Sequence, residues 1–210
     1  MRDLEKIEAR WAGHVPALMD ASFRYAVLCP FAETPEGLSL LLEARSPDLK
    51  SHPGEVCFPG GRVEPGETET GCALRETEEE LAIPPDRVRL LGLGDFICSV
   101  AGFTLQPVLG AITAETLAAV RPSPAEVAES FTVPVSFFTG TPPEVYTYTL
   151  SSGGPEKFPY GSVGVGTDHL WVGGQVDVPV WHWKGHAIWG MTARIIRSLV
   201  AEPVKREGEP

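Results

Sequence analysis

Closely spaced carboxylates are the residues of this chain whose types and spacing most clearly suggest chemistry. Four of the five residues from 76 to 80 are glutamate, and Glu67 precedes them. Like charges one turn apart destabilise a helix, so a run of this density is tolerated best where a divalent cation neutralises it. Carboxylate oxygens are the ligands that hard ions such as Mg²⁺ prefer. The run therefore predicts a metal site, and the alternative is a solvated acidic helix face.

The sequence around the run predicts a helix over residues 69–81. Pro65-Gly66 marks a turn just before it, and Thr68 or Thr70 is a suitable N-cap. At about 100° per residue, three of the glutamates fall within an arc of roughly 100°. They are Glu76, Glu79 and Glu80.

The same helix has an apolar side and carries a cation. Its apolar side consists of Leu74, Thr77 and Leu81. We expect this side to be buried, which leaves the carboxylates facing a ligand. Arg75 lies beside them, and its guanidinium is expected to pair with Glu67 or with a glutamate of the run. Glu78 points away and is interpreted as an ordinary solvated residue.

The full spacing of this segment resembles the box of the Nudix hydrolases. The matching positions are Gly61, five residues, Glu67, seven residues, Arg75-Glu76, two residues, and Glu79-Glu80. Thr77 stands where the family has an aliphatic residue, and Ala82 stands where it has glycine. Because a glycine after a helix usually supplies a left-handed conformation, alanine there is expected to cost about 1 kcal/mol. Neither change removes a carboxylate.

The resemblance implies an α/β/α sandwich with a mixed β-sheet, formed by a single domain over residues 1–210 with the box at 61–83. It implies attack by water on a phosphorus of a nucleoside diphosphate that is linked to another group. Glu76, Glu79 and Glu80 become ligands of Mg²⁺ or Mn²⁺, which polarises phosphoryl oxygens and lowers the pKa of bound water. The general base is left open between Glu76 and a carboxylate outside the box.

Two glutamates outside the box are candidates for that base. Glu126 and Glu129 stand three residues apart, just before an apolar segment where many relatives carry a glutamate. We favour Glu126 of the two. The alternative is an acidic turn that leads into a strand.

An upstream motif resembles the coenzyme A pyrophosphatase branch of the family. The matching residues are Leu41, Leu42, Ser46, Gly54, Phe58, Pro59, Gly60 and Gly61. Lys50 stands where the branch has arginine, which keeps the charge but loses the forked geometry for phosphate. The resemblance implies hydrolysis of coenzyme A or its thioesters to 3′,5′-ADP and the phosphopantetheine part.

The residue types of this motif suit a substrate that carries phosphates. Gly60-Gly61 lets the backbone approach a phosphate closely, and Arg45 and Lys50 supply positive charge. The expected substrate-binding residues are Arg45, Lys50, Gly54, Phe58, Gly60 and Gly61. Two other functions stay open: a Nudix hydrolase of ADP-ribose, a dinucleotide or an oxidised nucleotide, and a ligand sensor without catalysis.

The composition limits the kinds of partner that the protein is expected to bind. A net charge of −11 and a pI near 4.9 disfavour nucleic acid, whose binding proteins carry basic patches. There is no run of 18 apolar residues and no apolar signal core, so we expect no membrane association and a cytoplasmic protein. The four cysteines are interpreted as reduced thiols, with a Cys57–Cys98 bond left open. The expected partner is a small molecule of the coenzyme A type, and both a monomer and a homodimer are open.

Apolar patterning predicts the remaining elements. An N-terminal helix over about 3–19 is expected to dock on the body through Leu4, Ile7 and Trp11. A C-terminal helix over about 187–200 is expected to bury Ile188, Met191, Ile195 and Leu199. Strands are expected at Phe23–Pro30, Leu38–Ala44, Val88–Phe96 and Thr104–Thr113, with a hairpin of Val145–Leu150 and Val176–Trp183.

Two further interpretations concern the second half of the chain. Residues 151–166 are rich in glycine and proline and are expected to form a mobile loop, with a lid over substrate as the alternative. Trp171, Trp181 and Trp183 are interpreted as core residues, and stacking on an adenine is the alternative.

Overall fold

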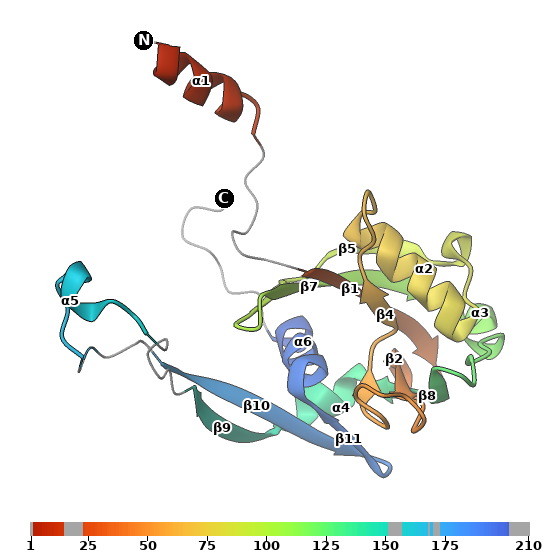
Figure 1. Ribbon diagram of the computed structural model, residues 1–210. Helices are drawn as coiled ribbons and strands as arrows, with labels where there is room; N and C mark the ends of the chain where they lie inside the picture. Colours follow the sequence, from red (N-terminus) through yellow and green to blue (C-terminus); the bar gives the residue numbers. More distant parts are fainter. Residues whose placement is uncertain (1, 15–22, 151–156, 168, 170–172, 202–210) are drawn as a thin grey trace, which may run out of the picture.

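A large mixed sheet forms the centre of the computed structural model, which describes residues 2–14, 23–150, 157–167, 169 and 173–201 (Figure 1). Its eight strands are β1 (Phe23–Thr34), β2 (Gly37–Arg45), β3 (Val56–Cys57), β4 (Gly60–Arg62), β5 (Arg89–Leu93), β6 (Ile97–Ser99), β7 (Phe103–Ile112) and β8 (Val127–Pro134). The central order is β3-β2-β1-β7-β5. The long pairing of β1 with β7 is parallel, and the other pairings are antiparallel.

A second sheet and several helices complete the described chain. The second sheet has the order β11-β10-β9, formed by β9 (Glu144–Leu150), β10 (Gly174–Trp183) and β11 (His186–Trp189). The helices are α1 (Arg2–Trp11), α2 (Glu69–Leu81), η1 (Pro85–Arg87), α3 (Ala114–Ala118), α4 (Val135–Gly140), α5 (Tyr160–Val163) and α6 (Gly190–Val200).

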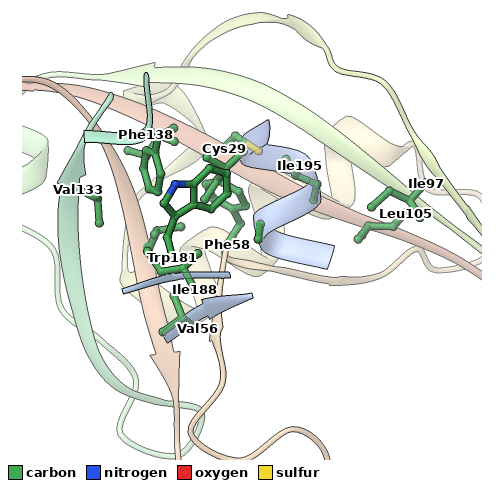
Figure 2. Close-up of a cluster of buried hydrophobic side chains, with 14 residues drawn as sticks. Cys29, Val56, Phe58, Ile97, Leu105, Val133, Phe138, Trp181, Ile188 and Ile195 are labelled. Carbon is green, nitrogen blue, oxygen red and sulfur yellow. The ribbon is translucent and has the colours of Figure 1, made fainter. Parts of the chain in front are cut away.

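Alternation along the central strands divides the core into two layers. Successive side chains of a strand point to opposite faces of the sheet. On β2, Leu41 packs in one layer with Leu81 of α2, whereas Leu40 and Leu42 pack in the other with Ile196 of α6. Figure 2 shows the second layer, where residues of both sheets meet α6. Helices thus cover both faces of the sheet, and the expected α/β/α sandwich is confirmed.

The N-terminal helix differs from its prediction. It ends at Trp11, and Gly13 follows with φ of +74°, a left-handed position that commonly ends a helix. Residues 15–19 of the prediction lie outside the described residues. The expected docking on the body is wrong, because Leu4, Ile7 and Trp11 are 62%, 55% and 53% exposed and α1 stands apart from the sheet (Figure 1).

The C-terminal helix differs from its prediction too, because it begins later. Ile188 and Trp189 belong to β11, where they pair with Trp181 and Val180 of β10. The helix begins at Gly190, whose φ of +65° separates strand from helix. The expected buried stripe is therefore wrong at Met191, which is 39% exposed. The buried side chains of α6 are Thr192, Ala193, Ile195 and Ile196.

Other predictions of local structure agree with the structure. Each of the four expected strand segments contains a strand, and β9 pairs with β10 as the expected antiparallel hairpin. Trp181 is a core residue, 3% exposed, and Trp183 packs against the same cluster. Trp171 and residues 151–156 lie outside the described residues, so the lid alternative is untested. The four cysteines are unpaired. In the described part of the chain, no helix is both long and apolar enough to span a membrane.

Candidate active site

Local signals fix the bounds of α2, the helix that carries the carboxylates. Thr68 is its N-cap, and the threonine Oγ1 accepts a hydrogen bond from the Gly71 N–H at 3.0 Å. Ala82 follows the helix with φ of +55°, the left-handed conformation expected there. Thr77 is fully buried, and its hydroxyl donates to the Ala73 carbonyl at 2.6 Å. The two departures from the family pattern are therefore accommodated without changing the helix.

Arg75 joins three carboxylates, as the spacing predicted. Its Nε donates to Glu67 Oε1 at 3.0 Å and its Nη2 to Glu67 Oε2 at 3.2 Å. Its Nη1 donates to Glu76 at 2.9 Å and to Glu79 at 3.3 Å. The hydrogen bonds that Arg75 donates to Glu67 lower the pKa of Glu67 and raise the pKa of Arg75. The guanidinium thus keeps Glu67 ionised and orients the Glu76 side chain.

The first two residues of β4, Gly60 and Gly61, pack tightly against two carboxylates of α2. The Gly60 N–H donates to Glu80 Oε2 at 2.8 Å. A Cβ at Gly60 would lie 2.6 Å from Val27 Cα, and a Cβ at Gly61 would meet the carboxylate of Glu76. Position 60 therefore requires glycine because the backbone of β1 approaches too closely for a side chain, whereas a side chain at position 61 would displace the Glu76 carboxylate.

Glu80 is the most perturbed carboxylate of the run. It is 3% exposed. Burial, with repulsion from Glu43 as the second cause, raises its pKa to about 9. Burial also raises the pKa of Glu76, against the hydrogen bond from Arg75. The alternative of a solvated acidic helix face is therefore wrong for Glu80, because α2 lies close against Gly60.

Glu43 on β2 is a buried carboxylate that the sequence analysis did not select. It is fully buried, and burial raises its pKa to about 7. The Cys57 thiol donates to its Oε1 at 3.5 Å, whereas its Oε2 has no hydrogen-bond partner among the described residues. The negative charge of Glu126 contributes to the raised pKa of both Glu43 and Glu80, and that of Glu43 contributes to the raised pKa of Glu80.

A pocket of about 600 Å³ brings together seven of the predicted site residues. They are Arg45, Phe58, Gly60, Gly61, Glu76, Glu80 and Glu126. Glu126 is held in place by backbone contacts, since its carbonyl accepts from the Ser46 N–H at 2.7 Å and its N–H donates to Ser123 at 3.0 Å. The box helix, the upstream motif and the 123–130 segment therefore meet at one cavity.

Other predicted site residues do not line this pocket. Glu67 and Arg75 lie beside it, and Glu79 is held by Arg75 with its side chain 56% exposed. Lys50 is exposed, and Gly54 serves a turn with φ of +71° whose N–H donates to the Arg45 carbonyl. Glu129 lies 3.7 Å from His186 instead. Of the two outside glutamates, the structure thus brings Glu126 to the cavity.

The carboxylate oxygens of the pocket are of the type that a hard divalent cation prefers. Their present arrangement does not form a metal site. Within the described residues, no three His, Cys, Asp or Glu side chains are close enough together to form a metal site as they stand. Glu76, Glu80 and Glu126 nevertheless line one cavity and repel one another. An oxygen-rich, mutually repelling set is what a cation such as Mg²⁺ stabilises.

The pocket also contains residues that the sequence analysis did not assign to the site. Trp189, Gly190, Met191 and Thr192, at the junction of β11 and α6, form part of its wall. The apolar run there was interpreted as a buried helix stripe. The glycine at position 190 was the available sign of a break in that stripe.

Sequence comparisons with known proteins agree on one family. A NUDIX domain model matches residues 22–133. Nudix hydrolase 3 of Caenorhabditis elegans is 39% identical over 137 residues, which cover 64% of this chain and only 57% of that protein. An uncharacterized Nudix hydrolase NudL of Klebsiella pneumoniae is 35% identical over 179 residues, covering 84% of this chain and 81% of that protein. A crystal structure of a C. elegans Ap4A hydrolase binary complex has a TM-score of 0.45 and 21% identity, and covers 53% of this chain and 80% of that one.

Proposed function

The chain belongs to the Nudix hydrolase family, and we propose that it hydrolyses the diphosphate of coenzyme A or its thioesters with the aid of Mg²⁺ or Mn²⁺. The products are 3′,5′-ADP and the 4′-phosphopantetheine part. The observation that carries the proposal is the shared pocket. Arg45, Phe58 and Gly60 of the upstream motif line it together with Glu76 and Glu80 of the box.

The proposed roles of Glu76, Glu80 and Arg75 are supported by their positions in the structure. Glu76 and Glu80 hold the cation, and Glu79 is proposed as a third ligand on the resemblance alone. When bound, the cation offsets the repulsion between these carboxylates and the diphosphate and polarises the phosphoryl oxygens. Arg75 orients Glu76 through the 2.9 Å hydrogen bond, and the glycine at position 61 leaves room for the Glu76 carboxylate beside the backbone.

Glu126 is the proposed general base. It lines the pocket with the two ligands, whereas Glu129 does not. In the proposed step its carboxylate accepts a proton from the water that attacks phosphorus. The bond between that phosphorus and the bridging oxygen breaks, and the departing phosphate keeps the electron pair.

The test is product analysis. Purified protein is incubated with coenzyme A and Mg²⁺ or Mn²⁺, and the products are identified by mass. We expect 3′,5′-ADP and 4′-phosphopantetheine, formed at least about 100-fold more slowly by the Glu80→Gln variant. The absence of phosphopantetheine with both metals would contradict the proposal.

One observation favours a second candidate, hydrolysis of another nucleoside diphosphate derivative. Lys50, which replaces the arginine of the coenzyme A branch, is exposed and does not line the pocket. A panel of coenzyme A, ADP-ribose, dinucleotides and oxidised nucleotides, ranked by kcat/KM, separates the two candidates. Hydrolysis of none of these compounds by the parent protein would favour the ligand sensor.

A further inference from the structure

Glu43 of β2 is a buried carboxylate that the proposed roles of the site residues leave unused. It is 0% exposed, which is rare for a glutamate that has no cation as a partner. Side chains two positions apart on a strand point to the same face of the sheet, so Glu43 shares the face of Leu41. Leu41 packs there in one core layer with Leu81 of α2 and Val127 of β8. An apolar side chain would therefore suit position 43, and the carboxylate requires an explanation.

The strands and the helix around Glu43 place it directly behind the base of the pocket. On one edge of β2 it pairs with Cys57 of β3, and on the other edge with Ser130 of β8. Cys57, Glu80 and Glu126 line the pocket. Glu43 lies close enough to Glu80 and Glu126 for their negative charges to repel its own. The Glu43 carboxylate therefore belongs to the same group of charges as the carboxylates of the site.

One of the two carboxylate oxygens of Glu43 lacks a partner. Its Oε1 accepts a hydrogen bond from the Cys57 thiol at 3.5 Å, and a thiol is a weak donor. Its Oε2 is buried and has no hydrogen-bond partner among the described residues, and the same holds for Nε of Arg45. The guanidinium of Arg45 thus attracts Glu43 without satisfying this oxygen. Buried charged groups are as a rule paired or bound to a metal, so Oε2 indicates a ligand from outside the chain.

A divalent cation accounts for this oxygen better than a water molecule does. A water molecule would donate to Oε2 but would leave Glu43, Glu80 and Glu126 repelling one another. A cation binds carboxylate oxygens and also offsets their repulsion, and Mg²⁺ and Mn²⁺ prefer such ligands. As they stand, these carboxylates do not form a metal site, since their repulsion opposes a closer approach until a cation lies between them.

We propose that Glu43 is a further cation ligand, which holds Mg²⁺ or Mn²⁺ at the base of the pocket together with Glu80. This inference rests on the proposed function for the cation itself, and it adds a ligand from the central sheet to the ligands of the box helix. A ligand on the sheet fixes how deeply the cation lies, beside the buried Glu80 and away from the exposed Glu79. Glu126 then faces the cation from the opposite wall, where it is proposed to accept a proton.

Cation affinity in the absence of substrate tests the inference. Mn²⁺ binding to the parent and to Glu43→Gln is measured by calorimetry at about pH 8, because metal ligands must be deprotonated. We expect the variant to bind Mn²⁺ at least about tenfold more weakly, the lower limit for a disturbed metal site. Glu33→Gln is the matched control, because it removes the same charge from an exposed position of β1 that does not line the pocket. It should bind Mn²⁺ as tightly as the parent.

Thermal melts separate a cation ligand from a residue that only supports the fold. In EDTA, Glu43→Gln and Glu43→Leu should melt no lower than the parent, because they remove a buried carboxylate that lacks a partner. At one fixed Mn²⁺ concentration, the rise in Tm should be smaller for both variants than for the parent, since weaker binding to the folded state stabilises it less. Glu43→Leu matches the apolar Leu41 of the same face, so it provides a folded variant if the buried amide of Glu43→Gln is not tolerated.

Failure of the inference and failure of the proposed function give different results. If both Glu43 variants bind Mn²⁺ as tightly as the parent, the inference is overturned, whether or not coenzyme A is hydrolysed. If they bind Mn²⁺ more weakly but the parent hydrolyses no coenzyme A compound, the inference stands and the proposed substrate is wrong. If the parent binds neither Mn²⁺ nor Mg²⁺, both are overturned.

Discussion

The carboxylate of Glu80 accepts a hydrogen bond from the backbone N–H of Gly60 at 2.8 Å. This contact joins the carboxylate run of α2 to the turn of the upstream motif, two segments that are separate in the sequence. It also explains why Glu80 is buried while Glu79 remains exposed. A diphosphate that lies against the glycine turn would therefore lie beside the proposed cation ligands.

Replacing a proposed ligand should abolish activity without unfolding the protein. We expect Glu80→Gln to lower kcat at least about 100-fold, because loss even of the outer partners of a metal site commonly costs 10- to 100-fold. The amide can still accept the hydrogen bond from Gly60. Glu78→Gln, on the exposed side of the same helix, is the control and should keep full activity. Unchanged turnover in Glu80→Gln would refute the ligand role.

Gly61→Ala tests the close approach of the turn to Glu76. The added Cβ would meet the Glu76 carboxylate, which lies at the end of a flexible side chain and can move. We therefore expect a loss of kcat of at least about tenfold, the lower range for a disturbed metal site, with little change in Tm. Gly140→Ala, where no heavy atom lies within 4 Å of the added Cβ, should change neither. Wild-type kcat in Gly61→Ala would show that activity does not depend on the place of the Glu76 carboxylate beside Gly61.

Arg75→Lys tests whether activity needs the several hydrogen bonds that the planar guanidinium donates to Glu67 and Glu76. Lysine keeps the positive charge but cannot bind Glu67 with two parallel hydrogen bonds and still reach Glu76. We expect kcat to fall about 10- to 100-fold, as for other residues that orient metal ligands. Mn²⁺ affinity, measured by calorimetry, should weaken as well. Arg87→Lys on the surface is the charge-matched control, and an equal effect in both variants would contradict the positioning role.

Without a divalent cation, the protein should lose stability as the pH rises. Burial gives Glu43 a pKa of about 7 and Glu80 a pKa of about 9 in the folded state, against an ordinary value of 4.5. The folded protein thus binds more protons than the unfolded chain between about pH 4.5 and 9, so stability falls across this range. Thermal melts in EDTA at pH 5.5, 7 and 8.5 should show a decreasing Tm.

A variant separates this effect from the general acidity of the chain. Glu43→Gln removes one of the repelling groups, so its Tm should fall less steeply with pH than that of the parent. Saturating Mg²⁺ should raise the parent Tm most at pH 8.5, where the carboxylates are most easily ionised. If the Tm of parent and variant fell equally with pH, the repulsion between Glu43 and Glu80 would not be the cause of the fall.

Features set by local sequence were predicted well. Thr68 and the left-handed Ala82 mark the ends of α2, and alternating residues defined the hairpin of β9 and β10. In both cases the determining residues lie close together in the sequence. The fold class followed instead from the resemblance to the Nudix family, whose matching box positions run from Gly61 to Glu80.

Features set by contacts between distant segments were not predicted. The burial of Glu80 depends on Gly60, 20 residues away. Met191 lines the pocket, and Gly190, with its positive φ, separates strand β11 from helix α6 just before it. Glu43 was not selected, because nothing near it on β2 indicates that its carboxylate lies beside Glu80 in the folded protein.

Anomalous diffraction from a crystal soaked in Mn²⁺ tests the central claim most directly. We predict an anomalous peak in the pocket, bound by the carboxylates of Glu76 and Glu80 and facing the Gly60–Gly61 turn. Absence of a peak at this position at saturating Mn²⁺, with the two carboxylates apart, would contradict the account.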